Sequence, residues 1–204
     1  MSGGFWTLRR TAALLKRPAA ARKGLPTLLV FSDPERTPDL EALARRLPVG
    51  AALVFRAFGA ADAEATGRRL LKLVRARRGL LLIGADAGLA ARIGADGVHL
   101  PERAAFRARR LKASRPDWLV TAAAHSPRAM RRARAAGVDA AVVSAVFPSA
   151  SPSAGRPIGV LRLAQIARGA GLPVYALGGV NDRTAGRLQD VGLAGLAAVD
   201  GFRT

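Results

Sequence analysis

Two histidines and a pair of glycines are the residues of this chain best suited to chemistry. His99 and His125 are the only histidines among the 204 residues, and each ends or follows an apolar run. An imidazole titrates near neutral pH and can therefore move protons. Gly178 and Gly179 follow a third apolar run, and Asn181 behind them can cap a helix. This pattern predicts an anion site built from backbone N–H groups, although an ordinary tight turn uses the same glycines.

Two further segments could contact an anionic ligand. Arg56 ends an apolar run, and a buried guanidinium needs an anionic partner, which is either a ligand or a carboxylate such as Asp33 or Asp86. Segment 147–157 is rich in serine and proline and could close on a phosphate ester, although solvated linkers have the same composition. The side chains it would use are those of Ser149, Ser151 and Arg156.

Eight short apolar runs predict the strands that position these residues. They are rich in Val, Leu, Ile and Ala without clean alternation, which is typical of parallel strands buried on both faces. They cover approximately residues 26–32, 50–56, 79–84, 96–100, 118–124, 139–146, 172–178 and 194–199. Helical patterns lie between them, over approximately residues 38–47, 61–77, 87–93, 102–114, 127–136, 159–170 and 182–191. This alternation predicts an α/β fold with parallel pairing.

Turn residues support the same element boundaries. Ser126-Pro127 combines an N-cap with a first-turn proline. Gly94, Gly137 and Gly192 each follow a helical pattern just before a strand, as helix C-caps do. The segments around these glycines look like one repeated device, which indicates a repeated strand–helix architecture.

Eight strands predict a closed (β/α)₈ TIM barrel, short for this fold and lacking a full eighth outer helix. We expect residues 25–204 to form this single domain and residues 1–24 to be a basic, helical N-terminal segment that covers the gap. An open doubly wound sheet is the alternative, but no Gly-x-Gly-x-x-Gly fingerprint supports it. Barrel ligands bind at the carboxyl ends of the strands, and phosphate often binds after strands seven and eight. The phosphate-binding candidates are therefore Gly178, Gly179, Ala198 and Val199.

The charge of the chain favours anionic partners. The formal net charge is +19, and almost all of the positive charge is arginine, much of it on the two predicted helices of residues 102–136. Such a surface could track nucleic-acid phosphates, although a solvated helix face or a bias in codon usage gives the same enrichment. The absence of cysteine fits a reducing compartment, so we expect a cytoplasmic protein. No run approaches the length of a membrane span.

Five short segments occur in an order typical of one known family. They are residues 94–100 (GADGVHL), 124–126 (AHS), 146–148 (VFP), 155–157 (GRP) and 176–180 (ALGGV). Together they resemble the thiamine phosphate synthase/TenI family, over approximately residues 25–201. The resemblance implies a (β/α)₈ barrel that binds a thiazole phosphate and, in the synthase, a pyrimidine pyrophosphate with magnesium. It also makes His99 a candidate for substrate binding, in addition to Arg56.

The chain departs from the synthase pattern where that enzyme holds its metal. The resemblance leads us to expect carboxylates at the positions of Ala85 and Ala104, and a lysine at or near Pro152. Mg²⁺ needs carboxylates together with substrate oxygens. We therefore expect no cofactor, and Mg²⁺ only if synthase activity survives.

Three functions remain open after this comparison. The TenI-like branch, a thiazole tautomerase, needs no metal and uses a histidine at the position matching His125 as acid and base, which we expect here. An active thiamine phosphate synthase is the first alternative. The second is a noncatalytic basic barrel that binds phosphate or nucleic acid; a carboxylate at Asp200 near the phosphate would weaken either enzymatic reading. The oligomeric state stays undetermined.

Overall fold

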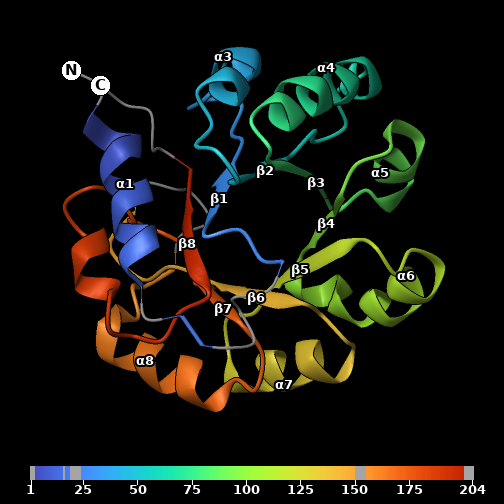
Figure 1. Ribbon diagram of the computed structural model, residues 1–204. Helices are drawn as coiled ribbons and strands as arrows, with labels where there is room; N and C mark the ends of the chain where they lie inside the picture. The colour runs from blue at the N-terminus through green and yellow to red at the C-terminus, as the bar shows by residue number, and fades with distance from the viewer. Residues whose placement is uncertain (1–2, 16, 19–23, 150–154, 200–204) are drawn as a thin grey trace.

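The eight predicted strands form a closed parallel barrel (Figure 1). The computed structural model describes residues 3–15, 17–18, 24–149 and 155–199. The strands are β1 (Leu28–Phe31), β2 (Ala52–Phe55), β3 (Leu80–Gly84), β4 (Gly97–Leu100), β5 (Leu119–Ala123), β6 (Ala140–Val143), β7 (Val174–Ala176) and β8 (Gly195–Ala198). Each pairs with the next along the chain, and β8 pairs with β1 through Leu29 opposite Ala197. The expectation of a (β/α)₈ barrel is confirmed, and the open sheet is excluded.

Helices surround the barrel and differ from the sequence prediction at two places. They are α1 (Gly3–Leu14), α3 (Leu40–Arg45), α4 (Ala63–Ala76), α5 (Ala87–Ile93), the 3₁₀ helix η1 (Glu102–Arg107), α6 (Ala108–Ser114), α7 (Pro127–Ala135), α8 (Gly159–Gly169) and the 3₁₀ helix η2 (Ala185–Leu188). The helix predicted over 102–114 is split into η1 and α6. The helix predicted over 182–191 is wrong, because only the short η2 forms there. The predicted strands are correct in position but too long at one or both ends.

Local hydrogen bonds explain why the segment after β7 does not form a regular helix. The Asn181 side-chain oxygen accepts from the N–H groups of Arg183 and Thr184, at 2.9 and 3.2 Å. The Thr184 hydroxyl donates to Gly179 O at 2.7 Å. Such side-chain bonds compete with helical backbone bonds, and Gly186 further lowers helix propensity. Asn181 therefore caps a tight turn rather than a long helix.

Helix α1 occupies the place where an eighth outer helix would lie. It contacts β1, β8 and η2, and its Leu8 and Ala12 are fully buried. Beyond the helix, Arg17 donates from Nε to Ala194 O at 2.6 Å and from Nη2 to Leu25 O at 2.9 Å. The N-terminal helix thus covers the gap as expected. No helix in the described part of the chain is long and apolar enough to span a membrane.

Two apolar clusters build the core, one on each side of the barrel wall. The inner cluster includes Leu29, Val54, Leu82 and Tyr175, whose side chains fill the barrel. The outer cluster fills the layer between strands and helices. Because neighbouring residues of a strand point to opposite faces, nearly every strand position is buried, which explains the continuous apolar runs of the sequence.

The repeated glycine segments close the amino-terminal end of the barrel. Gly94, Gly137 and Gly192 adopt φ values of 72°, 77° and 80°, as helix C-caps do. In the first two copies a carboxylate follows: Asp96 accepts from Leu81 N–H at 2.8 Å and Arg75 at 3.2 Å. Asp139 accepts from Val120 N–H at 2.7 Å and Lys112 at 3.2 Å. Each carboxylate thus links a strand start to a neighbouring strand and an outer helix.

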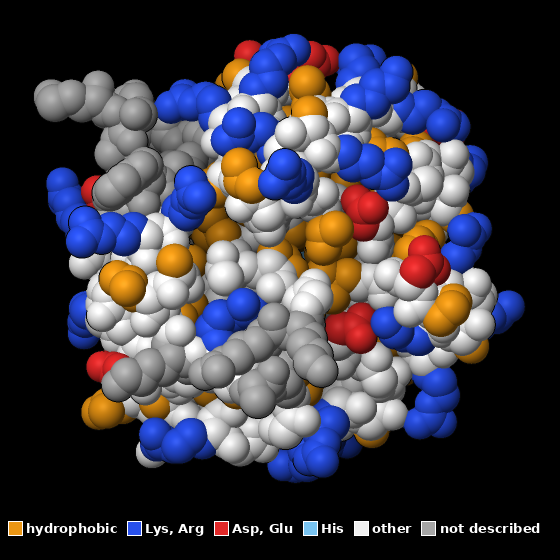
Figure 2. All heavy atoms as spheres, in the orientation of Figure 1, with side chains coloured by type: hydrophobic (Ala, Val, Ile, Leu, Met, Phe, Trp, Pro, Cys, Tyr) orange, Lys and Arg blue, Asp and Glu red, His pale blue; other side chains and the backbone are white. Residues whose placement is uncertain are grey.

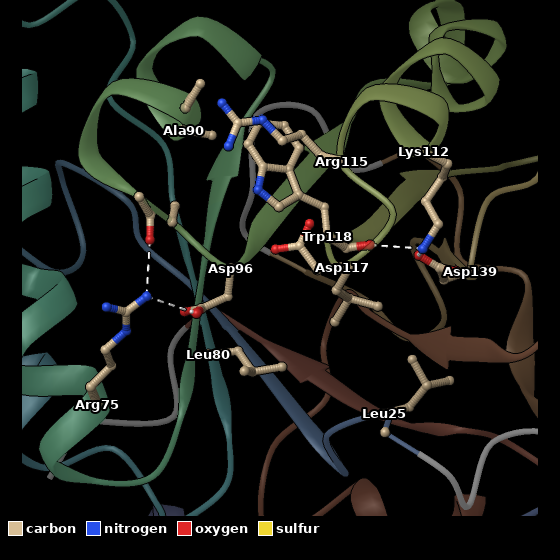
Figure 3. Close-up of a pocket in the computed structure, with 15 residues that line it drawn as sticks. Leu25, Arg75, Leu80, Ala90, Asp96, Lys112, Arg115, Asp117, Trp118 and Asp139 are labelled. Atoms are coloured by element: carbon tan, nitrogen blue, oxygen red, sulfur yellow. Dashed lines mark hydrogen bonds and ion pairs between the residues drawn. The ribbon is translucent and has the colours of Figure 1, made fainter.

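A cavity of about 560 Å³ lies among these groups at the amino ends of the strands (Figure 3). Figure 3 shows Arg75 directed at Asp96, and Lys112 beside Asp139. The Arg115 guanidinium lies over the Trp118 ring, 5.5 Å from its centre. The charged groups of this cavity are thus mostly matched within the protein.

Candidate functional site

A larger cavity, of about 890 Å³, opens at the carboxyl ends of the strands, where barrel ligands bind. It brings together residues from seven strands or their following loops. Those most relevant to chemistry are Phe31, Arg56, His99, His125, Ser144 and Leu177. The structure therefore joins both histidines and Arg56 in one site, although they lie up to 69 residues apart in sequence.

His125 is exposed in this cavity with one ring nitrogen already engaged. Its Nδ1 lies 2.9 Å from Ser144 O. A carbonyl oxygen can only accept, so Nδ1 carries a proton, and in the neutral ring Nε2 keeps its lone pair. The backbone N–H of His125 donates to the Glu102 carboxylate at 2.8 Å, and this bond fixes the backbone at the end of β5. His125 is thus held in the tautomer of a general base.

His99 has a different environment. Its Nδ1 lies 3.0 Å from the Thr121 hydroxyl on the neighbouring strand. Its ring packs edge to face against the Phe31 ring, with 4.9 Å between the ring centres. Burial lowers the pKa of His99 to about 3, and the positive charge of Arg56 acts in the same direction. The ring is therefore neutral at physiological pH and is poorly suited to accept a proton.

Arg56 is half-buried and bound on several sides. Its Nε donates to Ser32 O at 2.6 Å, and its Nη2 lies 3.1 Å from Asp33 Oδ2. The guanidinium carbon also lies 5.2 Å from the centre of the exposed Phe58 ring. Burial lowers the pKa of Arg56, and Asp33 partly offsets this effect. Asp33, and not Asp86, is therefore the salt-bridge partner anticipated from the sequence, while the guanidinium still borders the cavity.

The glycine pair forms the tight turn that the sequence suggested. Gly178 and Gly179 have φ values of 88° and 65°, a region that side chains rarely enter. A Cβ on Gly178 would lie 2.7 Å from Ala145 Cα, and one on Gly179 would lie 2.7 Å from Phe147 Cβ. In the described part of the chain, neither N–H donates to a backbone oxygen. The turn therefore requires glycine twice and presents backbone N–H groups close to the barrel mouth.

The remaining residues predicted to contact the ligand follow β6 or lie in or after β8, and they differ in burial. Ala198 is buried in β8, and the partly buried Val199 packs against the inner cluster. Ser149 is half-buried, and Arg156 is exposed. Ser151 and Asp200 lie outside the described residues.

The residues near β3 and β4 do not fit a magnesium site. Ala85 and Ala104 stand where carboxylates were expected. The nearby Asp86 caps α5 by accepting from Leu89 N–H at 2.8 Å, and Glu102 is bonded to His125 N–H. Within the described residues, no group of three or more His, Asp or Glu side chains could hold a metal ion. The carboxylates that are present are thus bonded to backbone N–H groups and do not form the ligand set that Mg²⁺ prefers.

Three contributors to the site were not identified from the sequence. Ser144 fixes the tautomer of His125, Thr121 bonds His99, and Phe58 lies over Arg56. Thr121 is directly opposite His99 in the strand register. An approximate register of adjacent parallel strands could have found it, whereas the contacts of Ser144 and Phe58 depend on loop geometry.

Comparisons with known proteins agree with this arrangement. The sequence model of the family described as thiamine monophosphate synthase matches residues 28–202. A putative thiamine-phosphate synthase 2 of Aquifex aeolicus is 30% identical over 183 residues, which cover 87% of this chain and 98% of the relative. A thiamine-phosphate synthase of Pyrococcus furiosus is 28% identical over 84% of each chain.

Solved structures give the same result. The structure of a thiamine phosphate pyrophosphorylase from Pyrococcus furiosus aligns with a TM-score of 0.74 and 27% identity, over 85% of each chain. A structure described as native KDPGal aligns with a TM-score of 0.63 at 18% identity, which shows the shared barrel fold alone.

Proposed function

Because the chain belongs to the thiamine monophosphate synthase family, we propose that it binds a thiazole phosphate at the mouth of its barrel and isomerises it by proton transfer through His125. The observation that supports this proposal best is the 2.9 Å contact between His125 Nδ1 and Ser144 O. In the neutral ring this contact makes Nε2 the nitrogen with the free lone pair, and the exposed ring lines the cavity.

The proposed reaction needs only one residue to move a proton. Nε2 takes a proton from one position of the ligand's thiazole ring system, and the resulting imidazolium returns a proton at another position. The ligand is isomerised, and the protein regains its starting state, so atoms and charge balance. General acid–base groups typically accelerate such steps by about 10²–10⁴-fold.

The remaining residues of the mouth position the ligand. The N–H groups of Gly178 and Gly179 would hold the phosphate, as glycine turns do. Val199 would lie beside it after β8, in the position where barrels often bind phosphate. Arg56 would add positive charge from the opposite side of the cavity, although Asp33 neutralises part of it. His99, neutral and bonded to Thr121, would shape the pocket without exchanging protons.

A synthase reaction is the competing function within the family. It would require a site for a divalent cation, and the side chains at Ala85 and Ala104 cannot supply the ligands. The test is to assay the purified protein for both reactions, each with Mg²⁺ and with a chelator. We expect isomerisation of the thiazole carboxylate phosphate that is unaffected by the chelator. Formation of thiamine phosphate that depends on Mg²⁺ would replace this proposal with the synthase function.

A further inference from the structure

We propose that the outer surface of α6, α7 and α8 binds the phosphate backbone of double-stranded nucleic acid. These three consecutive helices contain no aspartate or glutamate. We call their shared outer surface the basic face. Its positively charged residues are Arg109, Arg110, Lys112, Arg128, Arg131, Arg132, Arg134, Arg162 and Arg168.

The opposite group of helices shows that this chain does pair its arginines where acids are present. Glu41 of α3 accepts from Arg45 and Arg69, at 2.7 and 2.9 Å. Glu64 of α4 accepts from Arg68 and Arg92, at 2.7 and 3.0 Å. Each of these carboxylates therefore forms ion pairs with two arginines, which partly neutralises the positive charge on the surface of α3 and α4.

On the basic face, neutralisation is nearly absent. Among the described residues, Arg132 forms an ion pair with Glu102 of η1 at 3.6 Å, and Lys112 forms one with Asp139. No ion pair involves Arg110, Arg128 or Arg131 within that part of the chain. The surplus of charge is thus local and does not merely follow from the net charge of +19. Blue side chains project from the lower rim of the molecule in Figure 2, where α7 and α8 lie in Figure 1.

The basic face is continuous across the three helices. Arg109 of α6 donates to Ala135 O at the end of α7, at 2.9 Å. Between α7 and α8 lies a groove of about 340 Å³, which both Arg131 and Arg162 line. Positions 128, 131 and 132 are three or four residues apart and share one side of α7. A phosphate backbone that crosses α7 would therefore meet arginines from all three helices.

The chemistry of this face favours a phosphate backbone over the alternatives. Guanidinium groups form bidentate hydrogen bonds with phosphate and stay charged at all relevant pH values. The three helices contain no aromatic residue, so stacking of unpaired bases is not supported. Leu161 is the one large hydrophobic side chain strongly exposed on them, at 84%, which is too little for insertion into a membrane. A duplex bound through its phosphates, without base recognition, fits these features best.

The experiment compares two variants that lose the same charge at different places. Arg110→Gln/Arg128→Gln/Arg131→Gln removes three unpaired charges from the basic face. Arg9→Gln/Lys72→Gln/Arg78→Gln removes three exposed charges from α1, α4 and the loop after α4. Binding of a labelled 30-base-pair DNA duplex of arbitrary sequence is measured by fluorescence anisotropy at several salt concentrations. Circular dichroism checks that each variant is folded.

We expect the basic-face variant to lose about 10²-fold in affinity near 0.1 M salt, because each phosphate contact contributes about 0.9 to the slope of log K against log salt. Its slope should fall by about three, while the control variant changes the slope by less than about one. Saturating thiazole phosphate should not displace the duplex, because the basic face lies on the outside of the barrel.

Three results would overturn the proposal. One is an equal loss in both variants, which would show that only the net charge matters. Another is the absence of wild-type binding to the duplex at micromolar protein and 50 mM salt. The third is binding to phosphatidylserine vesicles, lost in the basic-face variant, without binding to the duplex. That result would assign the face to a membrane surface.

Discussion

The two ends of the barrel differ in whether their polar groups have hydrogen-bond partners within the protein. At the amino-terminal end, Asp96 and Asp139 each accept one strand N–H and one basic side chain, so the charges lining that cavity are largely matched. At the carboxyl-terminal end, Nε2 of His125 has no hydrogen-bond partner among the described residues, and within that part of the chain the N–H groups of Gly178 and Gly179 donate to no backbone oxygen.

This difference separates the stabilising end of the barrel from the reactive end. Satisfied polar groups stabilise a fold, whereas polar groups held in place without a partner can bind or transform a ligand. The comparison predicts that substitutions of His125 and of the phosphate position change activity or ligand binding with little loss of stability. Substitutions at the amino-terminal end should do the reverse.

The largest effect is expected at His125. In His125→Asn, the amide NH₂ can still donate to Ser144 O, but the base at Nε2 is lost. We expect turnover to fall by about 10²–10⁴-fold while affinity for the thiazole phosphate stays nearly unchanged. Steady-state kinetics and calorimetry measure the two quantities. His99→Asn is the matched control and should retain most of the activity; an equal loss in both variants would contradict a specific role of His125.

The next effect concerns the phosphate position. Val199→Asp introduces a negative charge directly after β8, where barrels often bind phosphate, whereas Val199→Asn has nearly the same size without the charge. Gly179 itself is unsuitable for this comparison, because any side chain there collides with Phe147. We expect the aspartate to weaken binding by about 10²-fold relative to the asparagine, because nearby like charges repel strongly where water is partly excluded. Equal affinities in calorimetry would place the phosphate elsewhere.

At the amino-terminal end, Asp139→Ala should lower stability without affecting the ligand. The substitution leaves the Val120 N–H without its side-chain acceptor and removes the ion-pair partner of Lys112. We expect the free energy of unfolding to fall by about 1–3 kcal/mol in urea denaturation. Asp117→Ala is the control, since that carboxylate is exposed, and it should change stability by less than about 0.5 kcal/mol. A loss of ligand affinity in Asp139→Ala would break the separation of the two ends.

The smallest effect is the pH dependence that His99 imposes. Its pKa is about 3 in the folded protein and about 6.5 in the unfolded chain, so the unfolded state binds more protons between these values. The neutral, buried His99 therefore contributes to the free energy of unfolding. This contribution is complete above pH 6.5 and is lost as the pH falls toward the pKa of the folded protein. We expect wild type to lose up to about 2 kcal/mol more than His99→Asn between pH 6.5 and pH 5. Parallel stability curves for the two proteins would contradict the buried, neutral state of His99.

The sequence predicted the barrel because its strands are continuously apolar and its glycines end helices at regular places. It also placed His99, His125 and Arg56 at one end, since parallel strands share their carboxyl ends. It failed for residues 182–191, where side-chain bonds of Asn181 and Thr184 replace helical bonds. It could not find Ser144 as the partner of His125, because that contact depends on the path of a loop.

The exchange of ligand protons with solvent tests the role of His125 most directly. The thiazole carboxylate phosphate is incubated with the protein in D₂O with a chelator present, and its proton NMR signals are followed over time. A base that takes up a ligand proton exchanges it with solvent, so we predict that wild type incorporates deuterium while it isomerises the ligand. His125→Asn should slow this incorporation by about 10²-fold or more. No incorporation by wild type at saturating ligand, or an undiminished rate in His125→Asn, would contradict proton transfer through His125.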